Sequence, residues 1–386
     1  MWIALSLVLS AAVTAAAATI PFTAWNTSVV TSANLYYSQE AVDASGNSYV
    51  CGYTDGSVFG GSAGAVKGFL GKYGPSGHFV WGTQIPNGRF DSITIDPTGG
   101  VYVSSGSSIL KYNSAGNLQW SGGTPGDLVY GIAIDPSKNI FVAGVVGNPD
   151  NAFLSKLDSS GNVLWTRTPQ TSVTTTSYPS AVAVDSSGDV IMIGQDYFNN
   201  FTASNGFAAK YDPGGNLLWN PQFGSTTDST LTNGVAIDSK SNIYIAGEGG
   251  PLLGEPVSNM PGYLIKYDAT DNQQWISRFN QFSGPMPVRL DPNGGEYVPG
   301  SFNEILKYST TGTQVAQTPI PSSGLSDLAY NKGNLYLLNY SSDRNGFNSY
   351  LTDVVVAVVP EPSAIALLGW GCAGLLWIAF RRHVKT

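Results

Sequence analysis

Apolar and polar residues alternate along most of the chain between residues 41 and 316, and short turns rich in Asp, Gly, Asn and Ser interrupt the alternation at regular intervals. A period of two residues is typical of β-strands whose two faces meet different surroundings. The same region shows no stretch with the 3.6-residue period of an amphipathic helix. The pattern therefore predicts an all-β body built from many short strands.

One recurring element consists of a strand, a tight turn that begins with Asp, and a second strand. Its copies occupy residues 41–52, 93–106, 132–144, 182–194, 235–247, 288–300 and, in a weaker form, 328–339. The turns begin at Asp43, Asp96, Asp135, Asp185, Asp238 and Asp291, with Asn331 in the seventh copy. These positions are on average about 48 residues apart. Such a fixed period is the sequence signature of a repeat architecture.

A second hairpin follows each of the first six copies and carries a Lys in its first strand, with a Trp nine positions later. The pairs are Lys72 and Trp81, Lys111 and Trp120, Lys156 and Trp165, Lys210 and Trp219, and Lys266 and Trp275, whereas Lys307 is followed by Ala316. Two hairpins per repeat predict a four-stranded antiparallel blade, and seven blades close into a ring. We therefore expect a seven-bladed β-propeller.

The two hairpin sequences resemble the SBBP family of bacterial β-propeller repeats, whose units carry an Asp-x-x-Gly-Asn strand and a Lys-Leu/Tyr-Asp-x-x-Gly strand. The resemblance covers most of the body and implies the propeller fold. It leaves the function open, because propellers host many activities.

The seventh repeat lacks a downstream strand that ends in Trp. Its third strand is expected at Tyr350–Val358, where Asp353 stands in the Lys position. The segment Ile20–Trp25 ends in Trp and could supply the missing strand, which would remove an open sheet edge. We therefore expect the body to span residues 19–358, with 19–26 closing the last blade. The alternative is that the N-terminal segment is only a spacer.

The N-terminus predicts export. Residues 3–18 form an apolar run that ends in small residues, which is typical of a secretory signal at residues 1–18 with cleavage near Ala18. A buried terminal strand or helix would be the alternative.

The C-terminal segment 359–386 contains three ordered elements. Pro360, Glu361 and Pro362 precede an uncharged stretch at 364–380, which predicts a transmembrane helix, and Arg381 and Arg382 follow it. An ordinary membrane anchor would account for the apolar stretch and the arginines but not for the tripeptide.

The order of these elements resembles the PEP-CTERM sorting tail of Gram-negative bacteria. The resemblance implies that an exosortase-type transpeptidase recognises the tripeptide and releases the protein from the inner membrane. The protein would then reside at the cell surface or in the extracellular matrix.

Composition narrows the possible functions. The chain has 18 Lys and Arg against 26 Asp and Glu, for a net charge of −8, and it has no basic stripe, which argues against nucleic-acid binding. Two His and two Cys leave most metal sites and His-based catalytic schemes without the residues that they need. Cys372 lies in the apolar tail and cannot easily meet Cys51. We therefore expect no catalytic, cofactor or metal site.

The recurrent Asp residues could in principle be calcium ligands, but each turn offers too few oxygen ligands for a calcium loop. Asp at the start of a turn more often caps backbone N–H groups two residues on, and we expect that role. The Trp residues could be ligand platforms, but their equal spacing favours packing between adjacent blades.

The connections between the two hairpins, and those between blades, vary in length, whereas the turns within the hairpins are nearly constant. In a four-stranded blade all variable connections emerge on one face, where binding usually occurs. The aromatic residues of these connections are the candidate ligand contacts: Tyr53, Phe59, Tyr197, Phe198 and Phe201. The alternative is that these loops merely pack together.

The favoured function is an exported binding or structural module, associated with the cell surface or with exopolysaccharide, whose partner is a polysaccharide or a protein. The competing class is a propeller enzyme of the quinoprotein or glycan-processing type. Residues 212–219 resemble the tryptophan-docking motif of quinoproteins. However, the chain has no adjacent pair of cysteines, and its few arginines are scattered over the body.

Overall fold

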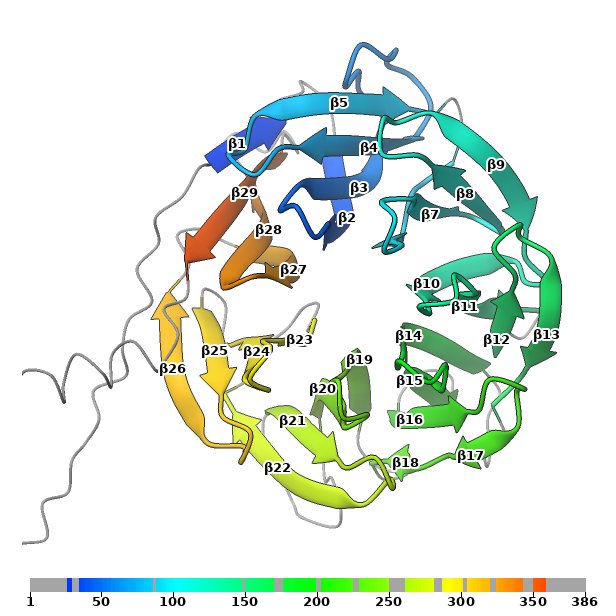
Figure 1. Cartoon of the computed structure of the whole chain (residues 1–386), viewed down its shortest axis with the longest axis vertical. Coiled ribbons are helices and arrows are strands. Elements are labelled where there is room, and N and C mark those ends of the chain that lie inside the picture. The colour runs from blue at the N-terminus through cyan, green and yellow to red at the C-terminus, as the bar shows by residue number, and fades with distance from the viewer. Residues whose placement is uncertain are drawn as a thin grey trace, which may run out of the picture.

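The structure is a computed structural model that describes residues 26–29, 35–85, 88–147, 150–169, 176–198, 203–224, 229–249, 261–280, 287–300, 304–319, 324–342 and 350–358. The strands in these ranges form a ring of seven antiparallel sheets (Figure 1). In each of the first six sheets the first strand in the sequence lies nearest the axis and the last lies at the rim.

We number the sheets in chain order. Sheet 1 holds β2 (Leu35–Val42), β3 (Ser48–Thr54), β4 (Lys67–Tyr73) and β5 (Phe79–Gln84). Sheet 2 holds β6 (Ile93–Ile95), β7 (Val101–Ser105), β8 (Ser108–Tyr112) and β9 (Leu118–Gly123). Sheet 3 holds β10 (Leu128–Ile134), β11 (Ile140–Val146), β12 (Asn151–Leu157) and β13 (Val163–Arg167).

Sheet 4 holds β14 (Thr176–Val184), β15 (Val190–Phe198), β16 (Ala203–Tyr211), β17 (Leu217–Trp219) and β18 (Gln222–Phe223). Sheet 5 holds β19 (Thr230–Ile237), β20 (Ile243–Gly249), β21 (Gly262–Tyr267) and β22 (Gln273–Phe279). Sheet 6 holds β23 (Arg289–Leu290), β24 (Glu296–Pro299), β25 (Glu304–Tyr308) and β26 (Gln314–Pro319). Sheet 7 holds β27 (Gly324–Asn331), β28 (Asn334–Ser342), β29 (Tyr350–Val358) and β1 (Asn26–Val29).

The core lies between neighbouring sheets. One apolar cluster joins Ile191 and Ile193 of sheet 4 to Ile243 and Ile245 of sheet 5, and all four side chains are buried. Because a middle strand is covered on both faces, nearly all of β11 is buried, whereas the rim strand β13 is exposed or half-buried throughout. Each fully buried Val, Leu or Ile stabilises the fold by about 1.5–3 kcal/mol.

The predicted fold class is wrong as it was stated, although the all-β propeller architecture is correct. Six sheets have four strands, but sheet 4 has a fifth, because β18 pairs with β16 beyond the end of β17. Asn220 and Pro221 follow Trp219 and interrupt the rim strand, since proline has no N–H for the ladder.

The predicted transmembrane helix is also not part of the observed fold. The described residues contain no helix of any kind, and hence none that could cross a membrane. The segment 364–380 and the signal segment 1–18 both lie outside the described residues.

The ring is closed by an N-terminal strand, β1, which lies directly after the segment that the sequence suggested. β1 pairs antiparallel with β29, and Ser28 lies opposite Asp353. Ile20–Trp25 lies outside the described residues. In the first five sheets Trp lies opposite Lys, and here Ser28 holds that position. The Trp pattern was a poor guide because the Lys that it accompanies elsewhere is an Asp in this sheet.

The predicted turn-capping role of Asp is confirmed. In the turn of sheet 2, Asp96 Oδ1 accepts hydrogen bonds from the backbone N–H groups of Thr98 (2.8 Å) and Gly100 (3.0 Å). Asp43, Asp185, Asp238 and Asp291 accept equivalent pairs of bonds. These carboxylates are therefore engaged by their own turns.

The Trp residues lie between neighbouring sheets, as predicted, but they are half-buried rather than enclosed. Trp165 and Lys156 are cross-strand neighbours in sheet 3, and both donate to the Pro213 carbonyl of sheet 4, at 3.1 Å each. The pairs Lys72 with Trp81 and Lys266 with Trp275 donate in the same way to Ser114 O and Thr310 O. Each pair is thus a latch between one sheet and the rim turn of the next.

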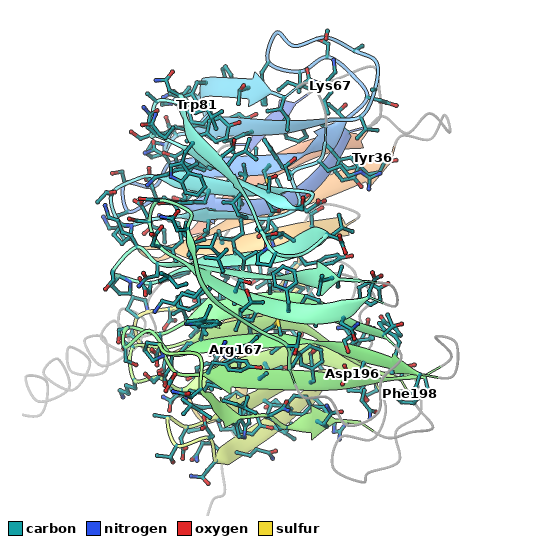
Figure 2. All side chains as sticks on the ribbon, turned by 90° about the vertical axis from the view of Figure 1, so that its right-hand side faces the viewer. Tyr36, Lys67, Trp81, Arg167, Asp196 and Phe198 are labelled. Carbon is teal, nitrogen blue, oxygen red and sulfur yellow. The ribbon has the colours of Figure 1, made fainter. Side chains whose placement is uncertain are left out.

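The ring has two unlike faces. We call the face that carries the turns within the hairpins the turn face, and the opposite face the variable face. Figure 2 views the ring from the side, with Tyr36, Asp196 and Phe198 toward the variable face and Trp81 toward the turn face.

Candidate functional site

The centre of the ring encloses a cavity of about 310 Å³ that is lined by residues from all seven sheets. Five of the inner strands carry a bulge at this level, between Tyr37 and Gln39, Val129 and Gly131, Pro179 and Ala181, Thr232 and Gly234, and Leu325 and Asp327. A bulge re-aims the chain and leaves one residue outside the ladder. The repeated bulges therefore turn polar residues such as Ser38, Ser180 and Asn233 toward the axis.

A charged network crosses sheets 6, 7 and 1 beside this cavity. Arg289 forms an ion pair with Asp327, with 3.0 Å between Nη2 and Oδ1. Asp327 Oδ2 accepts the backbone N–H of Glu40 at 2.8 Å, and Glu40 Oε1 accepts the Ser48 hydroxyl at 2.5 Å. The network therefore joins the sheet that closes the ring to both of its neighbours.

Glu40 stands at a position that is apolar in every other sheet. Its counterparts, three residues before the turn, are Ile93, Ile132, Val182, Val235, Val288 and Leu328. Burial raises the pKa of Glu40 to about 8, and burial also raises that of Asp327, which the Arg289 charge opposes. Since these groups bind one another, we assign the network to ring closure rather than to ligand binding.

An aromatic cluster lies at the variable face of sheet 1. The rings of Tyr36 and Tyr53 are stacked, with centroids 4.9 Å apart and planes inclined by 20°. The guanidinium of Arg89 lies 4.4 Å from the centroid of the Tyr53 ring. Tyr36 and Arg89 are exposed, so this cluster offers an aromatic surface with a cationic edge to the solvent.

A second aromatic cluster joins sheets 3 and 4 on the same face. Tyr178 meets Tyr130 and Tyr197 edge to face, with centroid distances of 6.2 and 5.8 Å. The Tyr178 hydroxyl donates to the carboxylate of Asp150 at 2.6 Å, and this bond raises the pKa of Tyr178 to about 12. All three rings are half-exposed. Their edges can therefore contact a ligand while Asp150 fixes the central ring.

Carboxyl groups accompany this second cluster. Asp196 precedes Tyr197, is buried, and accepts bonds from Ser177 Oγ (2.7 Å) and Gln222 Nε2 (3.1 Å). Glu248, at the same end of sheet 5, has a pKa raised to about 6 by burial. The variable face thus combines aromatic rings with carboxyl groups.

We call the two aromatic clusters together the tyrosine surface: Tyr36, Tyr53, Arg89, Tyr130, Tyr178 and Tyr197. Of the predicted ligand contacts, Tyr53 and Tyr197 belong to the tyrosine surface, in different clusters. Phe198 is half-buried at the end of β15, and Phe201 lies outside the described residues. The sorting residues Pro360, Glu361, Pro362, Arg381 and Arg382 lie outside them as well.

Phe59 packs against sheet 1 instead of facing a ligand. Its ring stacks on Phe79 with centroids 5.2 Å apart, and it meets Phe69 edge to face. Gly71 and Gly82 make room for it, since a Cβ on either would approach the ring to 2.7 or 2.3 Å. Phe59 thus has the contacts that the packing alternative expects.

Sequence reasoning missed Tyr36, Tyr130 and Tyr178. Tyr36 and Tyr178 each lie seven positions before the Asp of their turn, and Tyr130 lies five positions before it. Aligning the repeats through their turns and looking for aromatic residues upstream would have found them.

The described residues contain no group of three or more His, Cys, Asp or Glu placed to hold a metal ion.

Residues 219–250 match the family described as the SBBP β-propeller repeat. The chain carries a repeat of this kind. An uncharacterised WD repeat-containing protein of Acanthamoeba polyphaga mimivirus is 28% identical over 133 residues, which cover 30% of this chain and 10% of that protein. The chain therefore spans only about a tenth of this relative.

Solved structures show the same fold at low identity. The Pan2 WD40 domain of Neurospora crassa superposes with a TM-score of 0.57 at 13% identity, and it covers 84% of this chain and 90% of its own. The Dos1 propeller gives a TM-score of 0.54 at 9% identity and covers 88% of this chain and 96% of its own. The polysaccharide lyase Uly1 gives 0.58 at 10% identity and covers 88% of this chain and all of its own. At these identities the likeness concerns the fold alone.

Proposed function

We propose that this protein is an exported binding module that recognises a glycan through the tyrosine surface on its variable face. The observation that carries the proposal is the row formed by Tyr130, Tyr178 and Tyr197, with Asp150 bonded to the central ring. The C–H faces of sugar rings pack on aromatic side chains, and sugar hydroxyls bond to carboxylates and amides.

The geometry suits a ligand longer than one sugar. The tyrosine surface extends from Tyr36 and Tyr53 on sheet 1 to Tyr197 on sheet 4, so several sugar rings could be held at separate aromatic positions. Because sheet ends carry these rings, the contacts are held on rigid elements rather than on loops.

Export and sorting belong to the same proposal. The apolar segment 3–18 would direct secretion, and the sequence from Pro360 to Arg382 would be processed by an exosortase-type enzyme. Replacing Pro360, Glu361 and Pro362 with Ala should abolish processing in a host that carries such an enzyme. Mass spectrometry of the mature protein tests this, and a wild-type product that retains residues 364–386 would contradict it.

The test of glycan recognition is a glycan array with the purified chain, followed by calorimetry on the best ligand. Tyr178→Ala and Tyr36→Ala should each weaken binding about fivefold, since an aromatic contact contributes on the order of 1 kcal/mol. Leu164→Ala is the matched control, because Leu164 is 54% exposed on the rim strand β13. Unchanged affinity in both Tyr variants would show that the tyrosine surface is not the glycan site.

The competing function is a glycan-processing enzyme, which the likeness of fold to a polysaccharide lyase brings into consideration. The high pKa of Tyr178 keeps its phenol protonated at neutral pH, which argues against its use as a base. The quinoprotein-like segment behaves like the other hairpins: Asp212 caps its own turn, and Trp219 packs on Tyr267 with centroids 4.6 Å apart. Release of shorter products from any bound glycan would favour the enzyme.

A further inference from the structure

The turn face carries a second cavity, of about 580 Å³, between the inner turns of sheets 5, 6 and 7. Its presence follows from the turns themselves. In sheet 7 the residues Lys332 and Gly333 form a two-residue turn between Asn331 and Asn334, whereas five residues separate β19 from β20. Both Lys332 and Gly333 have positive φ, at 47° and 88°, as a type I′ turn requires. The short turn leaves space beside its neighbours.

Three lysines line this cavity. Lys240 and Lys332 are exposed at the tips of the turns of sheets 5 and 7. Lys266 is half-buried, and its Nζ lies 4.9 Å from the ring centroid of Tyr244, which also lines the cavity. Two exposed lysines thus border one space, with the latch residue Lys266, whose Nζ donates to Thr310 O, beside them, in a protein whose net charge is −8.

The carboxylates nearby cancel only part of this charge. Asp238 accepts bonds from the backbone of Lys240 and Asn242, from the Asn242 amide and from the Tyr244 hydroxyl, at 2.7–3.1 Å. Asp291 is paired with Lys307 at 3.0 Å. At the seventh position the repeated Asp is replaced by Asn331. The cavity therefore has more positive than negative charge available for a ligand.

We propose that this cavity binds the anionic group of an acidic saccharide between Lys240 and Lys332. Its volume is in the range of sites for sugar-sized ligands and far exceeds that of one inorganic anion. The half-buried Tyr330 ring supplies aromatic surface, and the side-chain oxygen of Asn242 is an acceptor for sugar hydroxyls. The site is separate from the tyrosine surface, which lies on the opposite face.

The test measures binding of trigalacturonate to the full chain by calorimetry, with neutral galactotriose and inorganic phosphate as the other two probes. We expect trigalacturonate to bind most tightly, and its affinity to fall when the salt concentration is raised from 50 to 500 mM. Equal affinity for galactotriose would overturn the role of charge. Equal or tighter binding of inorganic phosphate would overturn the assignment to a saccharide.

Two single variants locate the site. Lys332→Asn keeps a residue that favours the type I′ turn, and we expect it to weaken trigalacturonate binding at least fivefold, as should Lys240→Gln. Lys138→Asn is the matched control, because Lys138 also has positive φ (65°) in an inner turn, that of sheet 3, and does not line the cavity. All three variants change the net charge equally. Equal loss in the control and in Lys332→Asn would overturn the site.

Discussion

Two kinds of junction hold the ring together, and they differ in chemistry. Between sheets 3 and 4 the contact is apolar and is latched at the rim by Trp165 and Lys156. Between sheets 7 and 1 the buried contact includes Glu40 and Asp327, which bond to one another through the Glu40 backbone. The core of one junction is apolar packing, whereas the other includes specific polar partners.

The difference reflects how the junctions form. Sheets 3 and 4 follow each other directly along the chain, whereas Glu40 and Asp327 are 287 positions apart. Apolar burial is non-directional, but a buried carboxylate such as that of Asp327 is stable only when its hydrogen-bond donors and its cation meet it with the right geometry. We infer that the network around Asp327 selects the correct closing pair of sheets. Among the described residues Glu40 Oε2 has no hydrogen-bond partner, which is part of the cost.

The largest expected effect comes from removing the cation of this network. Arg289→Met leaves Asp327 buried without its partner and should lower the free energy of unfolding by about 2–4 kcal/mol, with the value reduced because the Arg289 side chain is 31% exposed. Urea denaturation measures the loss. Adding Asp327→Asn to this variant should restore part of it, and an equal loss in the double variant would show that the charge is unimportant.

A smaller effect concerns pH. The pKa of Glu40 is raised from 4.5 to about 8, so the folded state holds a proton that the unfolded state releases. Stability from this group is therefore complete below about pH 4.5 and is lost as the pH rises through 8. Glu40→Gln should flatten the fall in stability between pH 5 and 8 by on the order of 2 kcal/mol.

The pH experiment has an internal check. Burial also raises the pKa of Glu296 to about 8, so part of the slope should persist in the Glu40 variant. Thermal melts of wild type and variant at pH 5, 6.5 and 8 give the comparison. Parallel pH profiles for the two proteins would mean that Glu40 titrates normally.

The smallest effect comes from the ordinary junction. Trp165→Ala removes a half-buried ring and one hydrogen bond to Pro213, and should cost about 1–2 kcal/mol, below the 3–5 typical of an enclosed aromatic residue. Trp165→Phe should retain most of the packing and lose only the bond. A loss above 4 kcal/mol for the Ala variant, measured by urea denaturation, would show that the rim latch matters as much as the core.

The repeated part of the fold could be predicted because each copy carries the same residue types at the same spacing, and these residues form the same local contacts. Lys156 lies opposite Trp165 as their spacing suggested, and the Asp of each turn caps its own backbone. The prediction failed where a copy departs from the repeat. Pro221 splits a rim strand of sheet 4, and Ser28 rather than Trp25 lies opposite Asp353.

The candidate site was less accessible to sequence reasoning. Tyr53 and Tyr197 were identified from their loops, but their partners lie on other strands, and only the register places Tyr36 beside Tyr53. Phe59 looked equally suitable and proved to be a packing residue, because Gly71 and Gly82 accommodate its ring. Long-range pairs such as Arg289 with Asp327 leave no local pattern to find.

The position of β29 decides which face of the ring would point outward if the C-terminal segment were attached to a surface. β29 is hydrogen-bonded on both sides, to β28 and to β1, and its last residue Val358 lies opposite Asn334, directly after a turn of the turn face. A force applied through the C-terminal segment would thus act on a strand that is hydrogen-bonded to two neighbours, and many hydrogen bonds would resist it at the same time. It would also orient the molecule. The turn face would point toward the site of attachment, and the tyrosines of the variable face would point away from it.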